Sequence, residues 1–281
     1  FLTGFDLYGN NIDMSRGRRY VRNEGKKEGY KYVKVNELNF QLDKKTIYEL
    51  SFPLDLNGTT LTIPDSCYIR FVRKGKLYNG KIKGKLMNDR VSVEQFGAKG
   101  NGTFDDTEAI QNAINVSSNI VDFANAKYYL KGMLRISESN LMLRGNGCEL
   151  FFAPKEQAYP GLYIQSCSNI TLSGFKFNSS KGYKQYHNFP RDKGSLWSNR
   201  IAISASKVSG LNVTDCSFHE MEYAMKIDGG VGANKKVYLS NLKTFLDVSN
   251  PIYVSNTDSL LVDACIFEAS SNVSRFEHHI Y

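Results

Sequence analysis

Residues 91–115, VSVEQFGAKGNGTFDDTEAIQNAIN, constrain the fold of this chain more than any other segment. They begin with apolar residues spaced as in a half-buried strand: Val91, Val93 and Phe96. Glycines that tolerate positive φ then interrupt the strand: Gly97, Gly100 and Gly102. The apolar residues that follow recur at helical spacing: Ala109, Ile110, Ala113 and Ile114. The segment therefore predicts a strand, a glycine turn and a short helix in succession.

Two adjacent carboxylates stand where this helix begins. Asp105 or Asp106 is predicted to cap it, because an aspartate there can accept hydrogen bonds from unpaired N–H groups of the first turn. Negative charge is also favoured at this end of the helix dipole. An aspartate pair is typical of a catalytic site as well, but the cap accounts for both residues. We interpret them as structural.

The remaining sequence is periodic. Short apolar segments end at positions spaced by 29, 41, 26 and 23 residues: Leu143, Leu172, Val213, Leu239 and Val262. A second apolar step follows each of the later segments: Phe175 and Phe177, Cys216 and Phe218, Leu242, and Cys265 and Phe267. A further short strand recurs between these steps: 162–164, 201–203, 225–227, 252–254 and 280–281. Repeats of this length indicate one supersecondary unit each, stacked to bury a continuous core.

The strand, glycine turn and helix resemble the opening motif of the pectate-lyase-like superfamily, roughly F-G-A-x-G-D-G-x-x-D-D-T-x-A-I-x-x-A-I. The chain departs from this pattern at Asn101, where aspartate is usual. The resemblance implies an all-β fold, a right-handed parallel β-helix with a short capping helix near residues 105–115. The alternatives fit less well, because the L-x-x-L-x-L frame of leucine-rich repeats is absent and a β-sandwich explains neither the repeat nor the helix.

Residues 46–90 form another recognisable block, with alternating apolar positions and regular turn residues. The block resembles the segment that precedes the β-helix in large surface or tail-associated proteins of gut Bacteroidetes and their phages. The matching positions are Thr46, Ile47, Tyr48, Glu49, Asp55, Leu56, Asn57, Gly58, Ile63, Pro64, Phe71, Gly75, Asn79, Gly80, Ile82 and Gly84. We expect an arm or linker over 1–45, a β-rich segment over 46–90 and a β-helix over 91–281. The β-helix is expected to be truncated at its C-terminal end.

The net charge of +8 is confined to the first third of the chain. Residues 1–90 hold 18 Lys or Arg against 10 Asp or Glu, whereas residues 91–281 hold 18 of each. No helix-turn-helix, RNP or zinc motif accompanies this charge, so we predict no nucleic-acid partner. An acidic glycan, an acidic partner and a solvated or assembly-facing surface remain as alternatives. No apolar run approaches the ~20 residues of a membrane span.

The five cysteines include no C-x-x-C pair, which argues against a zinc or redox site. Cys216 and Cys265 occupy the same inward step, with Leu242 in the intervening coil. They are therefore expected about 9–10 Å apart, which is too far for a disulfide. We predict a buried ladder of these three residues.

Candidate site residues emerge when the outward positions of successive coils are stacked. Alignment of Ile164, Ile203, Ile227 and Val254 as inward residues predicts an outward row of Tyr163, Ala202, Lys226, Tyr253 and Tyr281. The neighbouring rows then hold Gln165, Ser204, Asp228 and Ser255 on one side, and Arg200, Ala224, Pro251 and His279 on the other. The candidate catalytic residues are Asp228, Glu222, Lys226 and Tyr253.

The 41-residue interval marks an insertion at residues 181–199, which is rich in aromatic and charged residues. Long loops on a regular scaffold often carry binding sites, and aromatic rings suit stacking on sugars. The candidate substrate-binding residues are Trp197, Tyr186, Tyr183, Arg191, Arg200 and His279. A loop that packs against a neighbouring subunit would use the same residues.

These residues suit sugar chemistry in two ways. A glycosidase needs two carboxyl groups at ~5–9.5 Å, such as Asp228 with Glu222 or Glu220. A lyase needs a base such as Lys226, Tyr253 or His279, and a cation or Arg200 to hold a uronate carboxylate. No metal-ligand pattern and no cofactor are predicted, although Ca²⁺ is one cation that a lyase could use.

The leading hypothesis is an extracellular protein that binds or degrades a polysaccharide, in a phage tail-spike-like receptor-binding or depolymerase component. We expect a homotrimer or a larger phage or surface assembly, located outside the cell or in the virion tail. The alternatives are a secreted bacterial polysaccharide lyase or glycoside hydrolase, and a non-catalytic tail or adhesin shaft.

Overall fold

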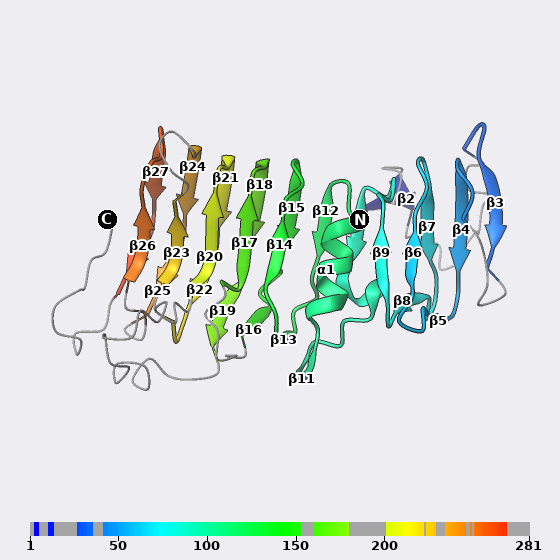
Figure 1. Cartoon of the computed structure of the whole chain (residues 1–281), viewed down its shortest axis with the longest axis horizontal. Coiled ribbons are helices and arrows are strands. Elements are labelled where there is room, and N and C mark those ends of the chain that lie inside the picture. Colours follow the sequence, from blue (N-terminus) through cyan, green and yellow to red (C-terminus); the bar gives the residue numbers. More distant parts are fainter. Residues whose placement is uncertain are drawn as a thin grey trace.

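The computed structural model describes residues 3–5, 11–13, 27–35, 42–152, 160–179, 201–221, 223–228, 234–245, 248 and 250–268. These residues form a right-handed parallel β-helix, so the predicted fold is confirmed (Figure 1). The described part contains one α-helix, α1 (Thr107–Val116), which agrees with the expected helix near residues 105–115.

Three parallel sheets run along the main β-helix. The first sheet contains β10 (Arg90–Ser92), β12 (Ile120–Asp122), β15 (Leu141–Arg144), β18 (Ser168–Ser173), β21 (Ser209–Thr214), β24 (Lys235–Ser240) and β27 (Leu260–Asp263). The second sheet contains β11 (Asn101–Asp105), β13 (Lys127–Leu130), β16 (Glu149–Phe152), β19 (Lys176–Ser179), β22 (Ser217–Phe218), β25 (Lys243–Thr244) and β28 (Ile266–Phe267). The third sheet contains β14 (Leu134–Ile136), β17 (Leu162–Gln165), β20 (Ile201–Ser206), β23 (Tyr223–Ile227) and β26 (Asn250–Val254).

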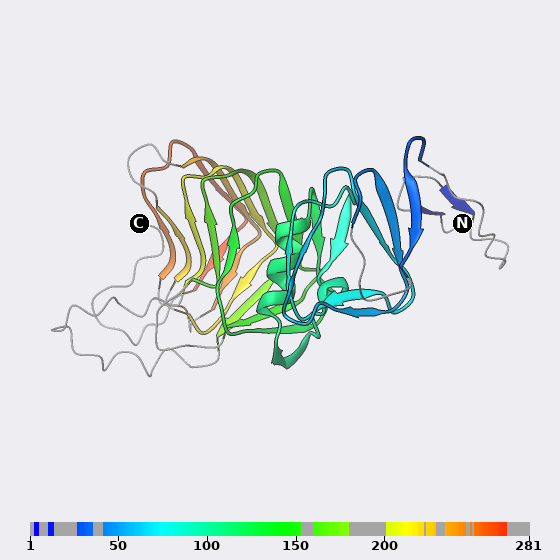
Figure 2. The same ribbon diagram turned by 45° about the vertical axis from the view of Figure 1, so that its right-hand side comes forward.

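Parallel pairing also holds together the coils that precede α1. Their sheets are β3 (Lys31–Lys34) with β4 (Thr46–Leu50) and β7 (Tyr68–Phe71); β5 (Pro53–Asp55) with β8 (Lys76–Tyr78); and β6 (Thr60–Thr62) with β9 (Lys81–Lys83). An antiparallel pair, β1 (Thr3–Phe5) and β2 (Asn11–Asp13), lies near the N-terminus. Figure 2 shows α1 between these coils and the main β-helix.

The core is the column of side chains that point inward from the stacked strands. Leu143, Leu172, Val213, Leu239 and Val262 stand in one register, as their spacing in the sequence predicts. The first four are fully buried, and Val262 in the last described coil is partly buried. Period-2 alternation therefore keeps one face of the first sheet on the core through successive coils.

The predicted ladder of Cys216, Leu242 and Cys265 is confirmed by the strand register. All five cysteines are free thiols. Cys216 and Leu242 are buried as predicted, whereas Cys265 is partly exposed, so the predicted burial holds for two of the three residues. Burial raises the pKa of the Cys216 thiol to about 12, which keeps it protonated and unreactive.

The opening segment differs from expectation in one detail. Val91 lies in β10, but Val93 and Phe96 belong to a 3-10 helix, η2 (Val93–Phe96), so the predicted strand ends at Ser92. All three apolar residues are still buried. A tight turn buries Val93 and Phe96, three residues apart, on one face as well as a strand would. The three glycines have positive φ, as predicted.

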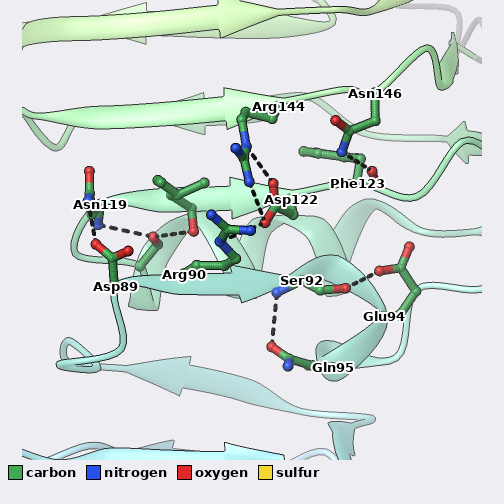
Figure 3. Close-up of polar contacts among 12 residues, drawn as sticks. Asp89, Arg90, Ser92, Glu94, Gln95, Asn119, Asp122, Phe123, Arg144 and Asn146 are labelled. Atoms are coloured by element: carbon green, nitrogen blue, oxygen red, sulfur yellow. Dashed lines mark hydrogen bonds and ion pairs between the residues drawn. The ribbon is translucent and has the colours of Figure 1, made fainter. Parts of the chain in front are cut away.

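An ion-pair ladder joins β10, β12 and β15 on the outer face of the first sheet (Figure 3). Asp122 on β12 accepts two hydrogen bonds from the Arg144 guanidinium on β15, with Nε–Oδ1 and Nη2–Oδ2 distances of 2.7 and 3.1 Å. On its other side Arg90 Nε lies 3.3 Å from Asp122 Oδ2. The paired carboxylate raises the pKa of Arg144. A carboxylate between two guanidinium groups bridges three coils without like-charge contact.

Helix α1 occupies the place of a strand between β9 and β14 (Figure 1). Its buried Asn112 accepts a hydrogen bond from the Ile82 N–H at 3.0 Å and donates one to the Gly80 carbonyl at 2.8 Å. On the other side Gln111 accepts from the Arg135 N–H at 2.8 Å and donates to the Arg135 carbonyl at 3.0 Å. The two amides therefore satisfy backbone groups of edge strands that would otherwise lack partners.

Among the described residues, no helix has the length and apolar character needed to cross a membrane.

Candidate functional site

A shallow groove of about 460 Å³ lies on the outer face of the third sheet. Its lining residues come from the segment before β14, from β14 itself and from β17, β20 and β23: Met133, Arg135, Pro160, Tyr163, Ile201, Ser204, Ser206, Lys226 and Asp228. We call this the third-sheet groove. It contains Lys226 and Asp228, two of the four residues predicted to be catalytic.

One outward row runs along the groove in strand register. Arg135, Tyr163, Ser204, Lys226 and Tyr253 pair successively from β14 to β26. Adjacent strands are ~4.8 Å apart, so this row extends for about 19 Å. A row of this length suits a chain of linked units better than a single small ligand.

The predicted alignment of β20 is wrong by two residues. Ile203 pairs with Leu162 and Met225, and Ala205 is the residue that pairs with Ile164 and Ile227. Ser204 therefore takes the place in the row that was assigned to Ala202, and Ser206 stands beside Asp228. Because side chains alternate with period two, a slip of two residues changes each residue's neighbours and leaves its face unchanged.

Cations and aromatic rings alternate within the row. The Arg135 Cζ lies 5.8 Å from the ring centroid of Tyr163, and the Lys226 Nζ lies 5.6 Å from that of Tyr253. Both distances are within the range of a cation–π interaction. Each pair thus places a positive charge over an aromatic ring, a combination that suits an acidic ligand with apolar faces.

Asp228 is the carboxylate that lines the groove among the residues described here. Its Oδ1 accepts a hydrogen bond from Ser255 Oγ at 2.7 Å and a longer one from Asn256 Nδ2 at 3.4 Å. Its backbone N–H bonds to the Ala205 carbonyl, which fixes the side chain at the end of β23. The carboxylate is partly exposed and so is accessible from the groove.

Distances across the row limit the chemistry that these residues can share. Arg135 and Lys226 are three strand spacings apart, or about 14 Å. At this backbone separation, Arg135 and Lys226 face different sugar residues of a chain that lies along the row. The described residues include base candidates, Lys226 and Tyr253, and one carboxylate, Asp228, at positions that face a ligand lying in the groove.

The fit of Ca²⁺ to the groove is poor within the described region. Ca²⁺ takes six to eight oxygen ligands, usually with several carboxylates. The groove offers one carboxylate there, and no cluster of three His, Cys, Asp or Glu suitable for a metal exists among the residues that the structure describes. We derive no step through a bound cation.

Several predicted residues lie outside the described residues: Glu222, Trp197, Tyr186, Tyr183, Arg191, Arg200 and His279. Conversely, stacking of the outward residues from β17 onward missed Arg135. Its signal is present in the sequence, because Leu134, Arg135 and Ile136 alternate in the same way as residues 162–164. Extension of the repeat by one coil toward the N-terminus would have added Arg135 to the row.

The aspartate pair at α1 has a different arrangement from the predicted one. Asp106 is the N-cap residue, but its buried carboxylate accepts from the Lys99 and Gly100 N–H groups at 2.7 and 3.1 Å. Asp105 Oδ1 accepts from the Thr107 N–H and hydroxyl and from the Lys131 N–H. Asp105 therefore accepts from the first N–H of the helix, whereas Asp106 occupies the N-cap position without a side-chain hydrogen bond to the helix.

The two carboxyls of this pair have opposite pKa shifts. Burial raises the pKa of Asp106, and this effect exceeds that of its two backbone N–H donors. For Asp105, burial also acts to raise the pKa, but the Thr107 and Lys131 hydrogen bonds prevail and lower it. Hydrogen bonds to the glycine turn and to the helix start account for both residues without any role in catalysis.

Comparison with known proteins identifies the type of β-helix. Residues 90–192 match the family model described as Rhamnogalacturonase A/epimerase, pectate lyase-like. The predicted resemblance to the pectate-lyase-like superfamily is therefore confirmed over this region. No curated protein matches the chain.

Two solved structures illustrate the extent of structural similarity. A provisionally assigned glycosyl hydrolase from Parabacteroides merdae ATCC 43184 aligns at 15% identity with a TM-score of 0.48, over 63% of this chain and 95% of that one. The ORF18 protein of Geobacillus virus E2 aligns at 19% identity with a TM-score of 0.22, over 63% of this chain. The alignment spans about half of the viral protein, 48% of its length.

Proposed function

Because residues 90–192 match a pectate-lyase-like family model, we propose that the protein binds an extracellular acidic polysaccharide along the third-sheet groove. The observation that carries this proposal is the outward row of Arg135, Tyr163, Ser204, Lys226 and Tyr253. Its cations suit carboxylate or sulfate groups, its rings can stack on sugar faces, and its hydroxyls can bond to sugar hydroxyls.

Binding is tested by titration of the protein with acidic and neutral polysaccharides of matched length. Tyr253→Ala should weaken binding of an acidic chain about tenfold, since one aromatic contact contributes about 1–1.5 kcal/mol. Tyr238→Ala is the matched control, because Tyr238 points outward from β24 on the first sheet. Equal losses for both variants, or tighter binding of neutral chains, would contradict the proposal.

We further propose that the bound polysaccharide is cleaved at the β23 end of the groove. Asp228 supports this second proposal, because hydrogen bonds from Ser255 and Asn256 fix a carboxylate at the edge of the groove. In a hydrolase, Asp228 would act as one of two carboxyl groups, with Glu222 as its predicted partner. In a lyase, Lys226 or Tyr253 would remove the proton α to a uronate carboxylate.

Asp228→Asn separates these mechanisms. A hydrolase should lose turnover by a factor of at least about 10² and retain binding, since an amide cannot act as a general acid or base. A lyase that uses Lys226 should retain most activity, measured by the ultraviolet absorbance of its unsaturated product. If wild type releases neither reducing ends nor unsaturated sugars from any acidic polysaccharide that it binds, the cleavage proposal is wrong and binding alone remains.

The proposed setting is a tail-spike-like receptor-binding or depolymerase component, outside the cell or in a virion tail. The sequence resemblance of residues 46–84 to tail-associated proteins supports this setting. It predicts a trimer, with a mass by light scattering of three times the 31.7 kDa chain. A monomer would instead favour the alternative of a secreted lyase or hydrolase, and a trimer without glycan binding would favour a structural shaft.

A further inference from the structure

A second cavity of about 460 Å³ lies beside the third-sheet groove, on the surface formed by β9, α1 and residues 131–133. We call it the helix groove. Its lining residues are Lys81, Ile82, Lys83, Asp105, Thr107, Glu108, Gln111, Asn112, Asn115, Lys131, Gly132 and Met133. Met133 lines both cavities, so the two grooves are neighbours on one wall of the molecule.

The same wall is continuous in the backbone. Helix α1 bonds to β9 through Asn112 and to β14 through Gln111, so it stands in the stack where a strand would otherwise lie. Figure 1 shows β9, α1, β14 and β17 side by side in this order. A ligand in the third-sheet groove can therefore continue past Met133 onto the helix without leaving the surface.

The charges of the helix groove favour an anion. Its cations are the exposed Lys81, Lys83 and Lys131, and its carboxylates are Asp105 and Glu108. Asp105 is already engaged, because its Oδ1 accepts hydrogen bonds from two N–H groups and a hydroxyl. Lys81 and Lys83 both point outward from β9, two residues apart on one strand, and so can contact the same extended chain.

We propose that the helix groove is a second binding site for acidic sugar residues, and that one polysaccharide chain occupies both grooves. This inference rests on the proposed function of the third-sheet groove. The aromatic rings of the outward row, Tyr163 in the groove and Tyr253 on β26, favour a sugar chain over an acidic peptide as the ligand that continues onto the helix. From β26 to the far side of α1 the chain would extend for roughly 30 Å.

Binding as a function of chain length tests this proposal. Labelled oligogalacturonides of three and ten units are titrated into the 281-residue protein and followed by fluorescence anisotropy. Lys81→Gln with Lys83→Gln should weaken the ten-unit chain by roughly 5- to 30-fold, as two surface charge contacts are lost, and should leave the three-unit chain unchanged. The matched control is Lys176→Gln with Lys243→Gln, which removes the same charge from exposed positions on the second sheet.

The outcomes distinguish this inference from the proposed function. If wild type binds the ten-unit chain but the Lys81 and Lys83 variant loses nothing, or loses equally for both lengths, the helix groove is not a binding site. An equal loss in the control pair would show a general charge effect and would also overturn the inference. If wild type binds neither chain, the proposed function itself fails. Comparison with a sulfated chain of ten units shows whether carboxylate or sulfate is recognised. If single-stranded DNA binds more tightly than either chain, the ligand is a nucleic acid and the inference is wrong.

Discussion

Asp105 and Asp106 are neighbours in sequence whose carboxyls stabilise two different turns. Asp106 holds the Lys99–Gly100 turn, and Asp105 connects the start of α1 to the backbone of Lys131. The sequence correctly predicted a structural role, because acidic residues at a helix start have a physical function in the fold. It could not predict which N–H groups they bind, since these depend on how the glycine turn folds back.

The Asp105→Asn variant tests this assignment through pH. The ionised Asp105 is favoured in the folded protein, so its contribution is complete above the unfolded pKa of 3.8 and is lost as pH falls through the lower folded pKa. Near pH 7 we expect the variant to be less stable by about 0.5–2 kcal/mol. Denaturant titrations should show this difference shrinking below pH 3.8. A constant difference, or loss of turnover at unchanged stability, would contradict a structural role.

Helix α1 is not a strand, yet it occupies a strand position in the stack and bonds to the strands on both sides. Asn112 is buried, and both of its amide atoms bond to backbone of the preceding coil. Gln111 does the same for Arg135, the first residue of the outward row. The helix therefore transmits the regular stacking to β14 and positions one end of the candidate binding row.

Hydrogen exchange at the Arg135 amide tests this function of the helix. Gln111→Ala removes the acceptor of that N–H, so its protection should fall while the amides of β18 keep theirs. We expect a stability loss of about 1–2 kcal/mol. Asn115→Ala is the control, because Asn115 contacts the Gln111 side chain and makes no hydrogen bond to β14. An Arg135 amide that stays protected would show that another group holds this strand.

At the level of strands, the sequence predicts the register of the first two sheets but not that of β20. The first two sheets were aligned correctly, because each coil carries one dominant apolar step and short turns fix the distance between steps. In β20 two inward residues, Ile203 and Ala205, fit the pattern equally well. The long insertion before this strand removes the distance constraint, so alternation alone could not choose between registers two residues apart.

At the scale of the whole molecule, the proposed function depends on one wall of the β-helix. Strand spacing converts residues far apart in the sequence into a row about 19 Å long, with Arg135 at one end and Tyr253 at the other. Individual residues of this row are ordinary surface residues, and no pair of carboxylates in the described part of the groove identifies a reaction. The candidate site arises because the strands stack these residues in one row. The superfamily resemblance therefore predicts the scaffold better than the chemistry.

The proposed binding of an acidic polysaccharide along the third sheet can be measured directly. Its most direct test is the affinity of wild type, Arg135→Gln with Lys226→Gln, and Lys176→Gln with Lys243→Gln for one acidic ten-unit oligosaccharide. We expect the first pair to weaken binding by roughly 5- to 30-fold and the second pair, on the second sheet, to have little effect. Equal binding by wild type and the Arg135 and Lys226 variant, or a larger loss from the second-sheet pair, would contradict the proposed binding.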